Sequence, residues 1–581
     1  METKLQLTLP PVVAALLRTL QAAGHQAFVV GGCVRDSLLG RAPEDWDICT
    51  SAQPGEVEAL FQGRRLLLNG KKHGTVAVVE GGKSWEITTF RCDGAYSDGR
   101  HPDAVRFVPD VRQDLARRDF TVNAMAWSPA AGLVDPFGGQ ADLRAGVLRC
   151  VGDPNARFAE DALRVLRAPR FAAQLGFALE PGTAAAARRC RGGVALVSPE
   201  RIFTELDKLL AGAQAGRVLA QYGEILAGAL PEILPCIGCT QPSRWHCYDV
   251  WQHTAVAVGA VEAHALAQAL TGHGDARGAR VLRWAALLHD LGKPACRTED
   301  ADGTAHFPGH NQRGGRMARE ILLRLRAPAS LTEGAAALVA VHDAPLPAAD
   351  ADILRLLHRR GAVFLRRLCQ LKLADLAAHA QNAAVTARWQ EVTQFAARME
   401  TLAADGCYRL DRLAVNGGDV LAAGLRPGPA VGQALDILLN AVMDATLPKA
   451  RPAGRAALPG GLLNLALSYV KAAPAGGGGR FVVRFFCDVA GRHAVQLIVG
   501  VDMGALVGFV GPIRELKSLG IGVYFEKEYI QTALYLTLTP NTGLFFAYCS
   551  IYCGFVGASE PSHCGLSLIC RLNLQNNTKR L

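Results

Sequence analysis

The stretch FVVGGCVRDSLLGRAPEDWDI, residues Phe28–Ile48, decides the fold of the first domain. An apolar run ends in two glycines, an Arg-Asp pair follows within a short helical pattern, and two aspartates separated by one residue come last. Apolar residues before a Gly-Gly turn predict a strand, and those that follow the aspartates predict another. The order strand, turn, helix and Asp-x-Asp strand therefore brings a tight turn near two carboxylates.

The two ends of this stretch suit a triphosphate and metal ions. Glycine lets a backbone approach phosphate closely, and a helix N-terminus offers free N–H donors to an anion. Asp45 and Asp47, two apart on an extended segment, point to the same face and can share divalent metals. Two such ions can activate an attacking hydroxyl and neutralise a leaving pyrophosphate. Taken alone, the glycines also fit an ordinary turn and the acids a solvated edge.

The composition favours a multidomain protein with a polyanionic partner. A chain of 581 residues that is 50% apolar exceeds one ordinary core, so about three or four domains are expected. The formal charge of +10 favours a polyanion. Cysteines without a regular framework and an N-terminus without a leader pattern predict reduced thiols and a cytoplasmic location. The most apolar long run, 494–510, contains Asp502, so no membrane partner is expected.

The pattern of apolar residues changes twice along the chain. Up to about residue 155, short β-rich runs at 27–30, 75–80 and 85–90 alternate with glycine-rich turns. From Phe158 onward apolar residues recur at spacings of three and four, which predicts helices as far as about Met443. A glycine-rich segment then leads into aromatic and β-branched runs. The sequence therefore predicts an α/β domain, a helical region and a separate tail.

Four further stretches extend the pattern of the opening one. They are HGTVAVVEGGKSWEITTFRCDGAYSDGRHPDAVRF at 73–107, DLARRDFTVNAMAW at 114–127, GLVDPFGGQADLRAGVLRCVGDP at 132–154 and RFAEDALRVLRAPRFAAQLGF at 157–177. Together with the opening stretch, they resemble the bacterial form of the class II tRNA nucleotidyltransferases, the CCA-adding enzymes. The resemblance runs from about residue 9 to 210.

The resemblance implies a domain order. It implies an α/β nucleotidyltransferase head with a polymerase-β-like mixed sheet, followed by an all-α neck, body and HD domain. We expect the head at 1–155, a neck with nucleotide-selecting and RNA-binding helices at 156–235, and an HD-type phosphohydrolase domain at 236–380. A helical body at 381–455 and an irregular C-terminal tail at 456–581 complete the expectation.

The resemblance also implies roles in the head. Asp45 and Asp47 would hold catalytic Mg²⁺, and Gly32 and Arg35 would contact the incoming nucleotide. Arg118, in the RRDFT motif, would lie near the triphosphate and link the catalytic and nucleotide-selecting halves.

The stretch at 157–177 carries the implied base selection. Asp161 and Arg164 would read CTP and ATP by hydrogen bonds from one helix face, since Asp accepts from an exocyclic amine and Arg donates to the ring. Arg167 and Arg170 would continue that face and meet phosphate; a solvated basic face is the alternative. Pro169 departs from the family pattern and costs a mid-helix hydrogen bond.

Two features of 73–107 bear on metal binding and product length. Glu86 is a candidate third metal carboxylate, with a solvent-facing strand residue as the alternative. The loop at 91–107 resembles the segment that permits the switch from CTP to ATP in enzymes adding all three nucleotides. Its presence favours addition of the complete CCA.

A second constellation of histidines and aspartates follows. Imidazole and carboxylate suit divalent transition metals, and a His-Asp pair followed by Gly-Lys-Pro is hard to explain by packing. The order resembles an HD-superfamily metal site, whose relatives hydrolyse phosphomonoesters or 2',3'-cyclic phosphates. The expected ligands are His253, His289, Asp290 and Asp375, with His310 and His342 for a second ion.

Cysteines and the tail raise two smaller questions. Cys236 and Cys239, followed by His246 and Cys247, fit either a small zinc site or reduced cysteines in a linker. The stretch Ile513–Thr532 resembles a piece of a large serine recombinase, but it lacks the nucleophilic serine segment, so no recombinase activity is expected.

These observations predict Mg²⁺-dependent addition of C, C and A to tRNA from CTP and ATP. The enzyme would bind tRNA largely through its backbone and shape. Three alternatives remain: a bacterial poly(A) polymerase, which would add A repeatedly; a protein acting mainly as an HD phosphohydrolase; and an inactive tRNA-binding relic. The oligomeric state stays open.

Overall fold

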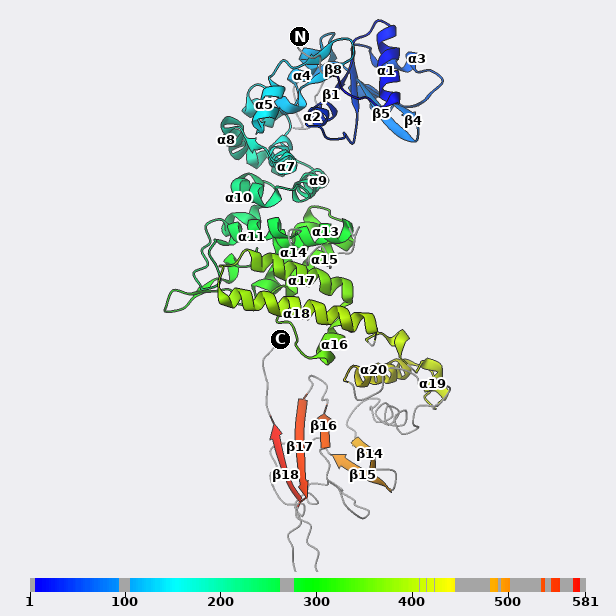
Figure 1. The fold of residues 1–581 in the computed structure, drawn as a ribbon, viewed down its shortest axis with the longest axis vertical. Helices are drawn as coiled ribbons and strands as arrows, with labels where there is room; N and C mark the ends of the chain where they lie inside the picture. The colour runs from blue at the N-terminus through cyan, green and yellow to red at the C-terminus, as the bar shows by residue number, and fades with distance from the viewer. Residues whose placement is uncertain are drawn as a thin grey trace, which may run out of the picture. The chain divides into compact units, whose positions relative to one another are not determined.

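The computed structural model describes residues 6–93, 105–261, 276–406, 408–413, 415–422 and 424–444, and five strands beyond residue 480 (Figure 1). The chain divides into two compact units, one of residues 1–347 with 360–398 and one of 348–359 with 399–581. Each unit is described by itself. No helix in the described ranges has both the length and the apolar character needed to cross a membrane.

The first unit begins with a seven-stranded mixed sheet in the order β3-β4-β5-β2-β1-β8-β9. Strands β2 and β5 pair in parallel, whereas the other neighbours are antiparallel. The strands predicted at 27–30 and 75–80 are confirmed, and the one predicted at 85–90 lies largely within β5. The bounds are β1 Ala27–Val30, β2 Asp47–Thr50, β3 Arg65–Leu67, β4 Thr75–Glu80, β5 Lys83–Thr89, β8 Ala126–Ser128 and β9 Gly132–Val134.

Short helices pack beside this sheet. Helix α1, Pro11–Ala22, buries side chains at helical spacing and contacts β1 and α3 (Figure 1). Burial of these apolar side chains at roughly 25 cal/mol per Å² is the main force that fixes the helix on the sheet. The remaining elements of the head are α2 Gly32–Leu38, α3 Pro54–Leu60, β6 Arg91–Asp93, β7 Val105–Phe107, α4 Val111–Ala116, η2 Thr121–Asn123 and α5 Gly139–Ala145.

Five helices follow the head, with the two-stranded parallel sheet β10–β11 among them. Helix α7 continues through Pro169, so the proline is accommodated within one helix. Helix α7 packs against both α9 and α10. The bounds are β10 Val147–Leu148, α6 Pro154–Glu160, α7 Arg164–Leu175, β11 Ala178–Leu179, α8 Pro181–Cys190, α9 Pro199–Leu210 and α10 Ala215–Leu226.

The helices that carry the predicted HD ligands complete the first unit. Helix α11 approaches α10 closely, because a Cβ atom on Gly216 would lie 2.6 Å from the Ala255 carbonyl oxygen. Glycine is therefore required at this crossing. Helix α11 also packs against α13 and α17. The bounds are α11 Val250–Ala260, α13 Ala276–Leu288, α14 His310–Arg324, α15 Ala329–Val341 and α17 Ala362–Ala377.

The second unit contains a small helical core and strands. Helices α19 and α20 bury Val420, Leu438 and their neighbours. The recombinase-like stretch at 513–532 lies outside the described residues, as do residues 94–104 of the loop at 91–107. The bounds are α16 Asp350–Arg360, α18 Ala383–Asp405, which has residues in both units, α19 Gly417–Ala422, α20 Pro429–Met443, β14 Phe481–Val489, β15 His493–Val501, β16 Leu534–Leu538, β17 Phe545–Cys553 and β18 Leu568–Leu574.

Candidate functional site

The Gly-Gly turn of the head lies directly on Arg118. Gly31 has φ +80°, a conformation that favours glycine, and a Cβ atom there would come within 3.0 Å of Arg118 Nη1. Arg118 donates to Asp114 Oδ2 at 3.4 Å, and its buried Nε has no hydrogen-bond partner in the described part of the chain. Gly32 begins α2 immediately after this turn. The structure thus brings the predicted residues Gly32 and Arg118 to one edge of the sheet.

Three carboxylates gather at the same edge. Asp45 and Asp47 are exposed on either side of buried Trp46, as alternation along an extended segment requires. Because β2 and β5 pair in parallel with Ile48 opposite Ile87, Glu86 is the neighbour of Asp47 across the strands.

The electrostatics of this edge show that the carboxylates repel one another. Although Asp47 is exposed, the protein atoms around its carboxylate reduce its hydration and raise its pKa; Arg118 opposes that shift, and Asp45 adds to it. Loss of hydration also raises the pKa of Glu86, and Asp47 and Asp45 raise it further. Relief of such repulsion is what a divalent cation supplies, so these residues fit a metal.

Arg35 is held rigidly beside the turn. Its Nε and Nη2 donate to the two carboxylate oxygens of Asp36 at 2.9 and 2.8 Å, and its Nη1 donates to Asn123 Oδ1 at 2.6 Å. A Cβ atom on Gly32 would lie 3.6 Å from Arg35 Nη2, so the guanidinium packs against the turn. Two of the five N–H groups of Arg35 take no part in these hydrogen bonds.

The expectation that Asp161 and Arg164 share one helix is wrong. Asp161 has an extended backbone between α6 and α7, and Arg164 is the first residue of α7. The reason is local: the Asp161 carboxylate accepts from the Leu163 backbone N–H at 3.0 Å, which stabilises a turn instead of a helix. Its other oxygen accepts from Arg201 at 2.8 Å, and Arg164 donates to Glu160 at 2.6 Å.

Arg167 and Arg170 do project toward one side of α7, but both meet carboxylates there. Arg167 donates to Asp119 Oδ2 at 2.8 Å, and Arg170 donates to Glu205 Oε2 at 2.8 Å. The pKa of Asp119 is lowered to about 2, because Arg167 and hydrogen-bond donors outweigh burial. Arg170 is buried with its partner, so it offers little guanidinium surface to phosphate. The alternative of a solvated basic face does not hold for Arg170.

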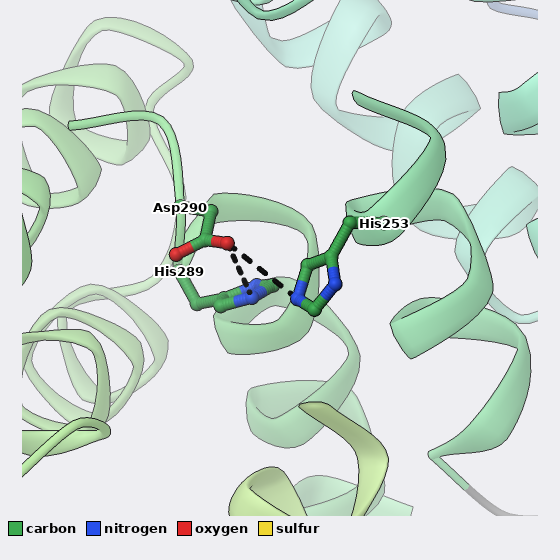
Figure 2. Close-up of side chains that lie close together, drawn as sticks. All are labelled: His253, His289 and Asp290. Carbon is green, nitrogen blue, oxygen red and sulfur yellow. Dashed lines mark ion pairs between the residues drawn. The ribbon is translucent and has the colours of Figure 1, made fainter. Parts of the chain in front are cut away.

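The second constellation converges on Asp290. Its Oδ2 lies 3.2 Å from His289 Nε2 and 3.5 Å from His253 Nε2 (Figure 2). Its Oδ1 lies 3.6 Å from Nε2 of His310 and 3.6 Å from Nε2 of His342. Asp375, from α17, approaches His253 Nε2 at 2.8 Å. All six predicted HD ligands therefore meet around one carboxylate, which faces two histidines with each oxygen.

The histidines are oriented by the backbone. The Nδ1 atoms lie within hydrogen-bond distance of carbonyl oxygens, which turns the Nε2 atoms toward the centre. The buried Nε2 of His289 and both oxygens of Asp290 lack hydrogen-bond partners in the described part of the chain. Orphaned buried atoms aimed at one point fit a metal centre. The pairs are His253 with Ala378, His289 with Ala286, His310 with Phe307 and His342 with Val339.

Charges at this centre are strongly coupled. Burial lowers the pKa of His289, but Asp290 and Asp375 outweigh it and raise the pKa to about 10. Burial raises the pKa of Asp290, but His289 and Lys293 outweigh it and hold the pKa well below its usual range. The centre is thus a network of buried, ion-paired charges whose inward atoms form no hydrogen bonds among the described residues.

Three residues, His246, Lys293 and His379, were not predicted to belong to this centre. His379 joins His253 and Asp375 as a group with metal-ligand geometry. Lys293 Nζ forms an ion pair with Asp290 Oδ2 at 2.7 Å and lies 3.3 Å from His246 Nε2. The Gly-Lys of the HD motif was a signal for Lys293, whereas His379 follows Asp375 by one helical turn, a spacing that could have revealed it.

The zinc alternative is not supported. All groups with metal-ligand geometry in the described part of the chain belong to the HD centre, and none contains a cysteine. Cys236 is buried, and burial raises its pKa above 9, which disfavours the thiolate that zinc requires. His246 instead contacts Ser243 and Lys293. Cys239 and Cys247 are free thiols, as the linker alternative expects.

Family models match three parts of the chain. Residues 27–149 match the poly A polymerase head domain, and residues 176–236 match a probable RNA and SrmB-binding site of polymerase A. Residues 260–380 match the HD domain. Together they cover most of the head, the helices α8 to α10 and most of the HD centre, whose predicted ligand His253 lies outside the match.

The chain is similar to curated proteins named CCA-adding enzyme. The protein of Limosilactobacillus fermentum is 33% identical over 432 residues, 74% of this chain and 92% of the relative. The proteins of Geobacillus thermodenitrificans and Geobacillus stearothermophilus are 42% and 46% identical. Those two alignments cover 64% and 53% of the relatives, so the strongest similarity spans between half and two thirds of their length.

Solved structures give the same similarity. The Bacillus stearothermophilus CCA-adding enzyme in complex with CTP is 32% identical, with a TM-score of 0.54 over 76% of this chain and 95% of that one. The Thermotoga maritima CCA-adding enzyme complexed with tRNA is 19% identical with a TM-score of 0.50, covering 80% of this chain and 96% of that one, and shows a shared fold alone.

Proposed function

This chain belongs to the CCA-adding enzyme family, and on that premise we propose that it adds C, C and A to the 3' end of tRNA from CTP and ATP. The single observation that carries the proposal is the edge of the head sheet. There, Asp45, Asp47 and Glu86 gather beside the Gly31–Gly32 turn and Arg118. A carboxylate cluster beside a phosphate-binding turn is what nucleotidyl transfer requires.

The head and HD domains imply dependence on divalent metal, and we propose Mg²⁺ at the head. Asp45 and Asp47 would hold it, and Glu86 would be the third carboxylate. A Mg²⁺ ion held there would supply Lewis-acid activation for the tRNA 3' hydroxyl and positive charge for the pyrophosphate leaving group. The residues of the chain orient the reactants: Arg35 and Arg118 face the turn with unspent N–H donors and would bind the triphosphate.

Base selection is proposed for Asp161 and Arg164. Arg164 donates from Nη1 to Glu160 and to the Arg157 carbonyl and from Nη2 to the Arg117 carbonyl, which leaves Nε and the second N–H of Nη2 for a base. Asp161 would have to share its Oδ2, now bound by Arg201, with an exocyclic amine. Both CTP and ATP carry that amine, whereas UTP does not, so the pair would reject UTP.

We propose that tRNA is bound through backbone and shape, since many tRNAs must be served. The basic surplus of +10 suits that partner. We also propose a cytoplasmic location, because the chain would meet its tRNA substrates there. The division at residues 155, 235, 380 and 455 also stays a prediction.

The HD centre supports a second activity, hydrolysis of phosphomonoesters or 2',3'-cyclic phosphates at RNA ends. The observation that favours it is the set of buried His289 and Asp290 atoms that face the other predicted ligands without hydrogen bonds to any described residue. Six ligands, His253, His289, Asp290, Asp375, His310 and His342, would hold divalent transition metal there. Such a metal would supply activation for the attacking water, and the burial of the ligands would exclude bulk solvent from the centre.

A pair of variants separates the two activities. D47N should abolish nucleotide addition, by at least about a hundredfold, while leaving phosphohydrolysis unchanged, because it removes one metal carboxylate of the head. H289A should do the reverse. Incorporation is measured on tRNA lacking its CCA, and hydrolysis on cytidine 2',3'-cyclic phosphate. Addition that survives D47N would contradict the proposal, and loss only with H289A would move the function to the HD alternative.

A further inference from the structure

We propose that Asn123 is a positioning residue that fixes Arg35 beside the nucleotide-binding turn and ties it to the following helices through Asp119. The proposal rests on the proposed nucleotidyl transfer and adds to it a residue that makes no contact with the reacting atoms. Asn123 is the last residue of η2, and it is buried, with 6% of its surface exposed.

The two ends of the Asn123 amide meet opposite charges. Its Oδ1 accepts from Arg35 Nη1 at 2.6 Å, and its Nδ2 donates to Asp119 Oδ1 at 3.1 Å. A carboxamide offers an acceptor on one side and a donor on the other. Because one neighbour is a cation and the other a carboxylate, only one orientation of the amide satisfies both. The polarity of this position therefore matches Asn and opposes Asp.

The backbone around Asn123 also belongs to the turn. The Gly31 N–H donates to the Met125 carbonyl at 3.1 Å, and a Cβ atom on Gly31 would lie 3.7 Å from the Asn123 carbonyl oxygen. The backbone of residues 123 to 125 thus contacts the Gly-Gly turn directly. Asn123 contacts the turn with its backbone and fixes Arg35 with its side chain.

On its far side, Asp119 connects this arrangement to α7. Asp119 Oδ2 accepts from Arg167, and the guanidinium groups of Arg35 and Arg167 lie 5.2 and 5.3 Å from the centre of the Phe171 ring. The electron-rich face of the Phe171 ring attracts both guanidinium groups, and this attraction adds to that of the Asp119–Arg167 ion pair. A continuous polar connection therefore runs from Arg35 through Asn123 and Asp119 to the helix that begins with Arg164.

Replacement of Asn123 by Asp keeps the shape but reverses half of this polarity. The new carboxylate would face Asp119, which is repulsive, and would give Arg35 a second anionic partner besides Asp36. Arg35 would then attract a triphosphate less, whichever base the nucleotide carries. Loss of about one charge-assisted hydrogen bond corresponds to roughly tenfold in affinity.

The test measures the Kd of CTP and of ATP by calorimetry with Mg²⁺, and the single-turnover rate at saturating nucleotide, on the full-length protein. N123D should raise both Kd values about tenfold and change the saturated rate less than about threefold. The matched control is N155D, since Asn155 also lies between an arginine and an aspartate but is exposed. N155D should change neither quantity.

A second variant keeps the test valid if N123D does not fold. D119N/N123D reverses the polarity of the hydrogen bond to residue 119, so it should fold and still bind both nucleotides weakly, because Arg35 still meets two carboxylates. Nucleotide Kd values within about twofold of wild type in a folded variant would overturn the proposal. So would a lower saturated rate at unchanged Kd. Wild-type protein that binds neither nucleotide would overturn the proposed function itself.

Discussion

At the scale of single residues, the HD centre is defined by buried, inward-facing atoms that form no hydrogen bonds within the described ranges. They are His289 Nε2 and the two oxygens of Asp290, of which Oδ2 is ion-paired with Lys293 at 2.7 Å, and a metal ion would satisfy atoms that are otherwise costly to bury. H289A and D290N should therefore lose metal, measured as bound metal per chain after dialysis. H306A is the control, because His306 is an exposed histidine on the hairpin of Thr298–Glu299 and Ala305–His306 and belongs to none of the groups with metal-ligand geometry in the described residues. Full metal content in D290N would contradict the assignment.

Metal uptake at this centre should release protons. The pKa of His289 is about 10, so the ring is protonated at neutral pH, and the metal must displace that proton. Affinity should therefore rise with pH between about 6 and 9. Calorimetry in two buffers with different ionisation enthalpies measures the release. Equal apparent enthalpies in both buffers would show that no proton leaves.

Residue types and spacing predict which side chains meet but not every contact they make. The HD ligands were predictable because few structures other than a metal centre bring His, His-Asp and Asp together in apolar helices. Lys293 and His246 were missed, since a loop and a turn place them by tertiary contact. The partners of Arg170 were missed for the same reason, because no local pattern links Glu205 to a helix thirty-five residues earlier.

At the scale of elements, Pro169 within α7 should lower the free energy of unfolding. Pro169 lies beyond the first turn of the helix, where it lacks the N–H that would bond to the Val165 carbonyl. P169A should raise the free energy of unfolding by about 1–2 kcal/mol, less than the full proline penalty because the smaller side chain leaves a void. Denaturant unfolding followed by circular dichroism measures the change.

The matched control for this prediction is P181A. Pro181 is the first residue of α8, where a missing N–H costs nothing because that group has no helical partner. P181A should leave the stability unchanged or slightly lower. Equal effects of the two substitutions would refute the account of Pro169.

The ion pair between Asp119 of the head and Arg167 of α7 should be lost in acid. The pKa of Asp119 is about 2 against 3.8 for an ordinary Asp, so the folded state favours the charged form. Its contribution, roughly 2 kcal/mol, is complete above pH 4 and is lost as the pH falls through 2. D119N should remove that part of the acid dependence, measured as the unfolding free energy between pH 5 and 2.5. An unchanged slope would contradict it.

Elements were predictable where the pattern was local. The strands at 27–30 and 75–80 and the long run of helices follow from periodicity. The break between α6 and α7 did not follow, because Glu160, Asp161 and Ala162 all fit a helix by composition. It depends on the Asp161 side chain, which bonds to the backbone of residue 163.

At the scale of the whole molecule, the residues of both sites lie in the first unit. A chain ending at Asp444 retains that unit and the small core around Val420 and Leu438. It should add nucleotides at a rate within about threefold of the full chain, since no site residue is removed. The comparison uses equal concentrations of the two proteins. Loss of addition with retained HD metal content would show that residues after 444 contribute to the head.

The central claim is that the head adds C, C and A, and the most direct test resolves products at single-nucleotide length. Purified full-length protein is incubated with Mg²⁺ and tRNA lacking its 3' CCA, with CTP alone, ATP alone or both. The account predicts an arrest after two additions with CTP and after three with both nucleotides. Long A tracts, or no addition at all by the folded full-length protein, would contradict the account.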